Sequence, residues 1–134
     1  MITYEEAGVM LDEIAAELPE EFYKDLNGGV ILLTDEKVHP ESGDSKDLYI
    51  MGEYHNQPHG LGRFITIYFG SFIRIHSHLS PEQQKIKLRR IVRHEFTHHL
   101  ESLAGERELE KMDEQDMEKY RRRKQNGNRY SERN

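Results

Sequence analysis

The stretch His94-Glu95-Phe96-Thr97-His98 decides how the rest of this sequence is interpreted. On an α-helix, residues four apart differ by about 40° around the axis, so His94 and His98 share one face. Their imidazoles can then reach a single metal ion, one helical turn apart. Glu95 points roughly a quarter turn away from His94, where it can touch a water molecule on the metal without being a ligand. This spacing is typical of zinc hydrolases in which the glutamate is the general base.

The motif lies in a predicted helix that starts after Ser80 and ends near Gly105. Ser80 suits the N-cap, Pro81 suits the first helical position, and Gln83 completes a capping box. Gly105 supplies a helix stop signal. Apolar residues recur on one broad side of this helix, at Leu88, Ile91, Val92, Phe96, Leu100 and Leu103. The two histidines border this side, which is where a cleft is expected.

A very charged segment follows and is expected to form a separate C-terminal helix. It runs from Glu106 to Lys124, with acidic residues in its first part and a basic cluster at 121 to 124. That order suits the helix dipole, so the basic cluster is interpreted as a helix end rather than a nucleic-acid site. Residues 1 to 124 are predicted to form a single domain, and the polar residues 125 to 134 a disordered tail.

The N-terminal half of the chain predicts one helix and three strands. Residues 3 to 18 have helical spacing, with a capping box at Thr3 and Glu6 and an end at Pro19. Compact or alternating apolar runs predict strands at 30 to 34, 48 to 54 and 63 to 69. The polar residues 35 to 47 are expected to be a loop. Residues 72 to 76 fit either an extension of the third strand or a short helix.

Four histidines outside the motif are interpreted as structural or solvated residues. His55 and His59 lie in a predicted turn at 55 to 60, where neither a helix nor a strand would hold them as a metal-binding pair. His76 and His78 precede the motif helix, where they would either line a cleft or pack at the helix start. We favour packing or hydrogen bonding for this second pair.

Composition excludes several classes of protein. A chain of 134 residues fits one domain, and its net charge of −6 argues against a general nucleic-acid binder. The absence of cysteine excludes disulfides and thiolate metal sites. The N-terminus does not resemble a signal peptide, and no apolar run approaches the length of a membrane span. We therefore expect a soluble cytoplasmic protein.

The order of a helix, three short strands and a helix with the motif resembles small bacterial zinc metallopeptidase-like proteins with a minimal zincin fold. The resemblance covers roughly residues 3 to 110. It includes the Leu-Pro-Glu-Glu-Phe run at 18 to 22, the strand at 65 to 68 and the doubled His98-His99. It implies an α+β fold with an N-terminal helix, a small three-stranded sheet, an active-site helix and a C-terminal helix.

In that family the motif continues as His-Glu-x-x-His-x-x-Gly-x-x-Asp. Its histidines map onto His94 and His98 and its glutamate onto Glu95. This sequence departs from the pattern after that point, since Glu101 stands at the glycine position and Ala104 at the aspartate position. The resemblance therefore supports the fold and two zinc ligands, and it leaves the third ligand open.

We predict Glu108 as the third zinc ligand. Catalytic zinc normally has three protein ligands, and without cysteine the third must be His, Asp or Glu. In the resembled family this ligand follows a helix-ending glycine by three residues, and Glu108 follows Gly105 by three. The alternatives are carboxylates on the motif helix, just after Gly105, or on a returning helix: Glu101, Glu106, Asp113, Asp116 and Glu118.

These residues predict a zinc-dependent peptidase that hydrolyses peptide bonds with a metal-activated water. Glu95 would take the proton of that water and pass it to the leaving amine. The substrate would be a short or extended peptide, or a strand added to the edge of the sheet. Candidates for an oxyanion donor are Tyr68, His76, His78 and Tyr120.

Two other functions fit the same residues. One is a non-catalytic metal-binding or protein-interaction module on the same scaffold, because a fold does not determine a function. The other, a weaker alternative, is a zinc hydrolase that acts on a non-peptide amide.

Overall fold

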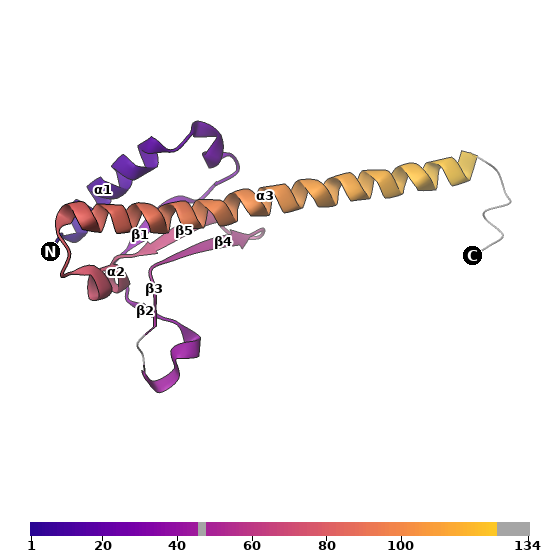
Figure 1. The fold of residues 1–134 in the computed structure, drawn as a ribbon. Helices are drawn as coiled ribbons and strands as arrows, with labels where there is room; N and C mark the ends of the chain where they lie inside the picture. Colours follow the sequence, from indigo (N-terminus) through magenta and orange to yellow (C-terminus); the bar gives the residue numbers. More distant parts are fainter. Residues whose placement is uncertain (46–47, 126–134) are drawn as a thin grey trace. The chain divides into compact units, whose positions relative to one another are not determined.

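The computed structural model describes residues 1 to 45 and 48 to 125. The elements, shown in Figure 1, are α1 (Tyr4–Glu17), the 3-10 helix η1 (Glu20–Tyr23), β1 (Gly29–Leu33), β2 (Lys37–Val38), the 3-10 helix η2 (Pro40–Ser45), β3 (Tyr49–Ile50), β4 (Gly52–Gln57), β5 (Gly62–Tyr68), α2 (Phe69–His76) and α3 (Pro81–Gln125). The protein is therefore α+β, as predicted. Its contacts divide it into two compact units, Met1–Leu100 and Glu101–Asn134, which are described separately.

Both predicted capping boxes form, and they determine where α1 and α3 begin. Thr3 Oγ1 accepts a hydrogen bond from the Glu6 N–H at 3.1 Å, and Glu6 Oε1 accepts one from the Thr3 N–H at 3.0 Å. Ser80 and Gln83 repeat this exchange at 3.2 and 3.3 Å. Each box satisfies backbone donors that have no partner inside the helix. The helix α1 ends just before Pro19, as predicted.

The three predicted strands all form, although the second is divided. The main sheet has the order β1-β5-β4, with β1 parallel and β4 antiparallel to the central strand β5. The run at 48 to 54 is interrupted at Met51, whose carbonyl accepts a hydrogen bond from the Tyr68 N–H at 2.8 Å. Its first part, β3, pairs with β2 in a separate two-stranded sheet. The predicted loop at 35 to 47 thus contains β2 and η2, because pairing with β3 orders a segment of weak local preference.

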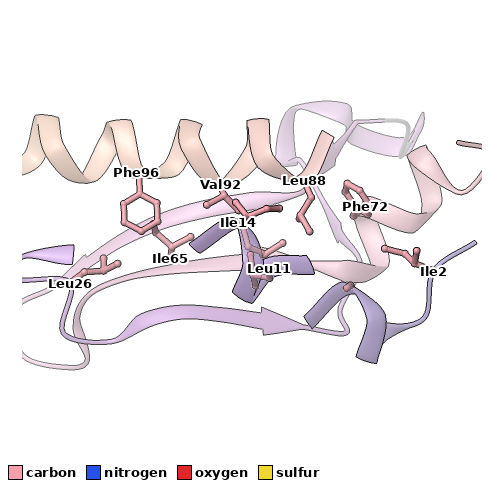
Figure 2. Packing of buried hydrophobic residues seen from close by; sticks show 11 residues of the cluster. Ile2, Leu11, Ile14, Leu26, Ile65, Phe72, Leu88, Val92 and Phe96 are labelled. Atoms are coloured by element: carbon pink, nitrogen blue, oxygen red, sulfur yellow. The ribbon is translucent and has the colours of Figure 1, made fainter. Parts of the chain in front are cut away.

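The hydrophobic core lies between one face of the main sheet and the two helices α1 and α3 (Figure 2). The alternation predicted for the third strand places Ile65 and Ile67 on this face, and neither has any exposed surface. The helices contribute a buried residue about once per turn, at Ala7, Leu11, Ile14, Leu88, Val92 and Phe96. This packing fixes the rotation of α3 and therefore the direction in which the motif side chains point.

The helix α3 continues through Gly105, so the predicted stop at this residue was wrong. A glycine ends a helix when it adopts positive φ, and Gly105 is not among the described residues that do so. Glycine inside a helix costs only about 1 kcal/mol relative to alanine. The predicted active-site and C-terminal helices are therefore one element. From residue 126 on, the predicted disordered tail lies outside the described part of the chain.

The strand β4 extends to Gln57 and includes His55. The prediction that His55 lies in a turn is therefore wrong. The His55 ring stacks on Phe64 with centroids 4.4 Å apart, and its Nε2 lies 2.9 Å from Thr66 Oγ1. Both partners belong to β5, and the sequence does not reveal such cross-strand contacts. His59 stays in the shorter turn and is exposed.

Residues 72 to 76 form the end of α2 rather than an extension of β5. Among the described helices, none is both long enough and apolar enough to cross a membrane.

Candidate metal centre

The exposed side of α3 brings the two predicted zinc ligands together. His94 and His98 are both exposed, and their Nε2 atoms lie 3.1 Å apart. Their rings meet edge to face, with centroids 4.6 Å apart. Two nitrogen ligands of a tetrahedral zinc ion, each at about 2.0–2.1 Å, lie roughly 3.3 Å from each other. The observed separation therefore fits one shared metal ion, with Nε2 as the binding atom of each histidine.

Glu95 lies on the buried side of this pair, against the beginning of β4. Its exposed fraction is 6%. A Cβ atom added to Gly52 would lie 3.2 Å from Glu95 Cγ, 3.3 Å from Glu95 Oε2 and 2.8 Å from Ile91 Cγ2. The absence of a side chain at Gly52 therefore allows the strand backbone to approach the carboxylate closely. This contact holds Glu95 beside the two histidines.

Burial raises the pKa of Glu95, because the charged carboxylate loses its hydration. Positive charge on His94 and His98 acts in the opposite direction, and the nearby carboxylate of Glu53 adds to the increase. A carboxylate with a raised pKa is better suited to take up a proton and return it near neutral pH. The environment of Glu95 therefore suits the role of general base.

Replacing Gly52 with alanine should displace Glu95 and Ile91. We expect a loss of about 1–3 kcal/mol in the free energy of unfolding, as for other overpacked sites. Denaturant unfolding measures the loss. Gly8→Ala is the matched control, because a Cβ there meets only Leu32 Cδ2 at 4.0 Å and alanine favours the helix α1. Equal stability of the Gly52→Ala protein and the wild type would contradict the close contact.

Glu53 follows Gly52 in β4 and, because strand side chains alternate, faces the opposite side of the sheet. The Tyr68 hydroxyl donates a hydrogen bond to Glu53 Oε1 at 2.6 Å, and Lys37 Nζ donates one at 2.5 Å. Burial alone raises the pKa of Glu53, but these hydrogen bonds and the charge of Lys37 outweigh it and lower the pKa. The hydroxyl hydrogen of Tyr68, a predicted oxyanion donor, is therefore already donated to Glu53.

The other predicted oxyanion donors contact residues outside the motif. The His76 ring packs against Phe72 with centroids 5.1 Å apart, and its carbonyl accepts a hydrogen bond from Gln84 Nε2 at 2.9 Å. His78 is exposed. Tyr120 belongs to the second unit, where Lys124 Nζ lies 5.5 Å from the centre of its ring. The packing favoured for His76 is thus observed, whereas its hydrogen bond is made by the backbone carbonyl and not by the ring.

The pattern assigns no role to His39 or His99, and the structure shows what His99 does. His99 is fully buried, and its Nε2 lies 2.7 Å from the carbonyl oxygen of Lys24. Because a carbonyl only accepts, Nε2 must carry the hydrogen. Nδ1 then accepts from the Tyr54 hydroxyl at 2.8 Å, and this hydroxyl accepts from Arg63 Nη1 at 3.1 Å. His99 thus ties α3 to β4 and to the segment after η1, and it holds the motif in place.

A sequence signal for this role exists. His99 lies three residues after Phe96 and seven after Val92, so it belongs to the buried side of the helix.

His99→Ala should lower the free energy of unfolding by about 2–4 kcal/mol, because it creates a cavity and removes two buried hydrogen bonds. Burial also lowers the pKa of His99, although the Lys24 carbonyl opposes the change. The unfolded chain takes up this proton near pH 6.5, and the folded protein does so only at lower pH. The stabilisation is therefore complete above about pH 6.5 and decreases as the pH falls.

Denaturant unfolding above and below this pH tests both parts of the prediction. The difference in stability between the wild type and His99→Ala should shrink at the lower pH. A replacement of the exposed His59 with alanine is the control and should leave stability nearly unchanged. A difference that grows on acidification would contradict the buried neutral histidine.

The six carboxylates considered as third ligands all belong to the second unit. Glu108 is exposed and lies 3.7 Å from Lys111 Nζ, and Glu118 lies 3.2 Å from Arg122 Nε. The continuous helix at Gly105 removes the chain reversal that motivated the choice of Glu108. Within residues 1 to 45 and 48 to 125, no group of three or more His, Asp or Glu side chains is placed to hold one metal ion. The third ligand therefore stays a prediction.

Comparison with known proteins finds a similar solved structure. No family model and no curated protein matches the sequence. A conserved hypothetical protein from Thermo thermophilus has a similar solved structure, with a TM-score of 0.65 and 31% sequence identity. The match covers 77% of this chain and 98% of that protein, whose description names no activity. The chain therefore belongs to the same family as this conserved hypothetical protein.

Proposed function

We propose that this protein is a cytoplasmic zinc-dependent metallopeptidase of the His-Glu-x-x-His type with a minimal zincin fold. The observation that carries the proposal is the convergence of the His94 and His98 Nε2 atoms to 3.1 Å, on the helix that also carries the buried Glu95. The spacing of nitrogen donors suits tetrahedral zinc, and the burial of Glu95, which raises its pKa, suits a proton acceptor.

In this proposal each motif residue has a separate role. His94 and His98 hold zinc through Nε2, with one carboxylate as a further ligand. Zinc, when bound there, polarises the scissile carbonyl and lowers the pKa of a water molecule. Glu95 accepts a proton from the attacking water and later donates it to the leaving amine. The backbone of Gly52 and the hydrogen bonds of His99 keep these side chains in position.

The free edge of β4 supports an extended peptide as the substrate. In the described main sheet, β4 is an edge strand that pairs with β5 alone. Such an edge offers backbone donors and acceptors to an added strand. Gly52 at the start of β4 lies against Glu95, so a peptide on this edge would pass the side of α3 that carries the motif. The peptide backbone would then supply most of the binding, so we expect little preference for particular side chains of the substrate.

Zinc content and peptide turnover test the proposal together. Purified protein loaded with zinc should bind one ion per chain and should cleave members of a mixed peptide library. Removal of the metal by a chelator should abolish cleavage, and added zinc should restore it. Stoichiometric zinc without cleavage of any library peptide would favour the non-catalytic alternative, a metal-binding or interaction module.

The third ligand can be identified by zinc affinity. The sequence-based choice of Glu108 predicts that Glu108→Ala weakens zinc binding by roughly 10- to 100-fold, the range seen when a supporting group of a metal site is lost. The same substitution is made at each alternative carboxylate: Glu101, Glu106, Asp113, Asp116 and Glu118. If Glu108→Ala bound zinc with wild-type affinity and one of the alternative variants bound zinc more weakly, the residue replaced in that variant would be the ligand.

A further inference from the structure

The helix of the second unit has a strongly asymmetric charge along its length. Its first part carries eight carboxylates, at Glu101, Glu106, Glu108, Glu110, Asp113, Glu114, Asp116 and Glu118. Only Arg107 and Lys111 are basic in that part. The last turns carry five cations, at Lys119, Arg121, Arg122, Arg123 and Lys124. Two such helices repel when they lie parallel and attract when they lie antiparallel.

The same helix exposes large apolar side chains. The exposed fractions of Leu109, Met112, Met117 and Tyr120 are 63%, 57%, 49% and 50%. At 100° per residue, Leu109 and Tyr120 differ by about 20°, and the two methionines lie about 70° to either side of them. These residues form one stripe, and every described side chain from 104 to 124 is exposed. A stripe of this kind on a charged helix is typical of a helix that pairs with another.

We propose that this stripe, defined by Leu109, Met112, Met117 and Tyr120, binds the same stripe of a second copy of the chain in an antiparallel helix pair. A two-fold axis between Glu114 and Gln115 places Leu109 level with Tyr120 of the copy, and Met112 level with Met117 of the copy. Leu109 and Tyr120 of the copy then face each other along the centre line, while Met112 and Met117 of the copy lie at the same level on opposite flanks. An interface between identical copies must be self-complementary in this way.

The charges on both flanks of the stripe fit the same arrangement. Glu108 and Lys119 are eleven residues apart and therefore lie on the same flank, about 20° from each other. Glu110 and Arg121 have the same spacing on the other flank. Around the two-fold axis, Glu108 meets Lys119 of the copy, and Glu110 meets Arg121 of the copy, within two residues of the same level. Opposite charges thus flank the apolar stripe on both sides.

Asp113 and Asp116 oppose the pairing and limit its strength. Both residues lie within the stripe near the two-fold axis. Asp113 is therefore level with Asp116 of the copy, and Asp116 with Asp113 of the copy. Like charges at this position weaken association. The pair is therefore a reversible one, and Asp113→Asn together with Asp116→Asn should tighten it several-fold. This double substitution is a second test of the proposal, in which association should become stronger rather than weaker.

Complementary charge reversals in the full chain test the proposal directly. One variant carries Glu108→Lys and Glu110→Lys, and the other carries Lys119→Glu and Arg121→Glu. Each alone should bind its own copy roughly 10- to 100-fold more weakly than the wild type does, because attractive contacts become repulsive. An equimolar mixture should restore the wild-type affinity, since every flank contact between the two variants is attractive.

Sedimentation equilibrium measures the association, and circular dichroism checks that each variant keeps its helix. The matched control is Arg107→Glu with Arg122→Glu, which changes the charge as much as the second variant but lies on the far side of the helix. The control should associate like the wild type. A wild-type chain that stays monomeric up to millimolar concentration would overturn the proposal, as would charge variants that associate like the wild type.

Engineered cysteines determine the direction of pairing, because the chain has none of its own. Leu109→Cys and Tyr120→Cys proteins are mixed and oxidised in a thiol buffer. The antiparallel pair predicts a mixed disulfide well above the statistical share. A preference for disulfides between identical variants would show a parallel pair and would contradict the proposal.

Discussion

Replacing Glu95 with glutamine should reduce peptide hydrolysis by about 10²–10⁴-fold, the usual contribution of a general base. Glutamine has nearly the same shape but cannot accept the proton of the attacking water. Zinc binding should be unchanged, because the ligands in the proposal are His94 and His98. Stability should not fall, since glutamine removes a charge whose burial is unfavourable. Initial rates with a library peptide, zinc content and denaturant unfolding give the three readings.

The matched control for this substitution is Glu82→Gln, an exposed glutamate in the first turn of the same helix. It should hydrolyse the peptide at the wild-type rate. Equal rates for Glu95→Gln and the wild type would show that Glu95 is not the base. A loss of zinc or of structure in Glu95→Gln would instead give this residue a structural role.

The combined substitution His94→Ala and His98→Ala should reduce bound zinc from one ion per chain to none. The two Nε2 atoms are spaced for a shared ion, and a single carboxylate holds zinc weakly. Both side chains are exposed, so the fold should be retained with a change in stability of only about 0.5 kcal/mol. Metal analysis after dialysis measures the loss, and peptide turnover should disappear with it.

Substitution of two other exposed histidines, His59→Ala and His78→Ala, controls for nonspecific binding of zinc to imidazole. This control should keep its stoichiometric zinc. If the protein without His94 and His98 retained one zinc per chain, the metal would bind elsewhere and the proposed centre would be wrong.

Much of the first unit could be predicted because its signals are local. The capping residues Thr3 and Ser80 bond to backbone groups within three residues, so the sequence contains both partners. The alternation at Ile65 and Ile67 and the helical spacing of Leu88, Val92 and Phe96 likewise give the buried faces. The convergence of His94 and His98 depends only on helix geometry, which is why the spacing alone predicts it.

The errors concern features that neighbouring residues do not decide. Gly105 is compatible with both a helix end and a helix interior, because glycine inside a helix costs only about 1 kcal/mol relative to alanine, which is too little to fix the helix end from the sequence. The polar neighbours of His55 predict a turn, whereas its partners Phe64 and Thr66 lie across the sheet. The choice of Glu108 depended on the chain reversal at Gly105, and the continuous helix removes that reason.

The sequence by itself determined the helix that carries the motif, the face shared by His94 and His98, and the offset of Glu95, because helical geometry relates residues a few positions apart. Only the tertiary structure decided that Glu95 is buried and that Gly52, 43 residues earlier in the chain, lies against its carboxylate. It also decided that His99 holds α3 through Tyr54 and Lys24. Burial and hydrogen bonding of this kind depend on packing between distant segments, and no local pattern encodes which segments will meet.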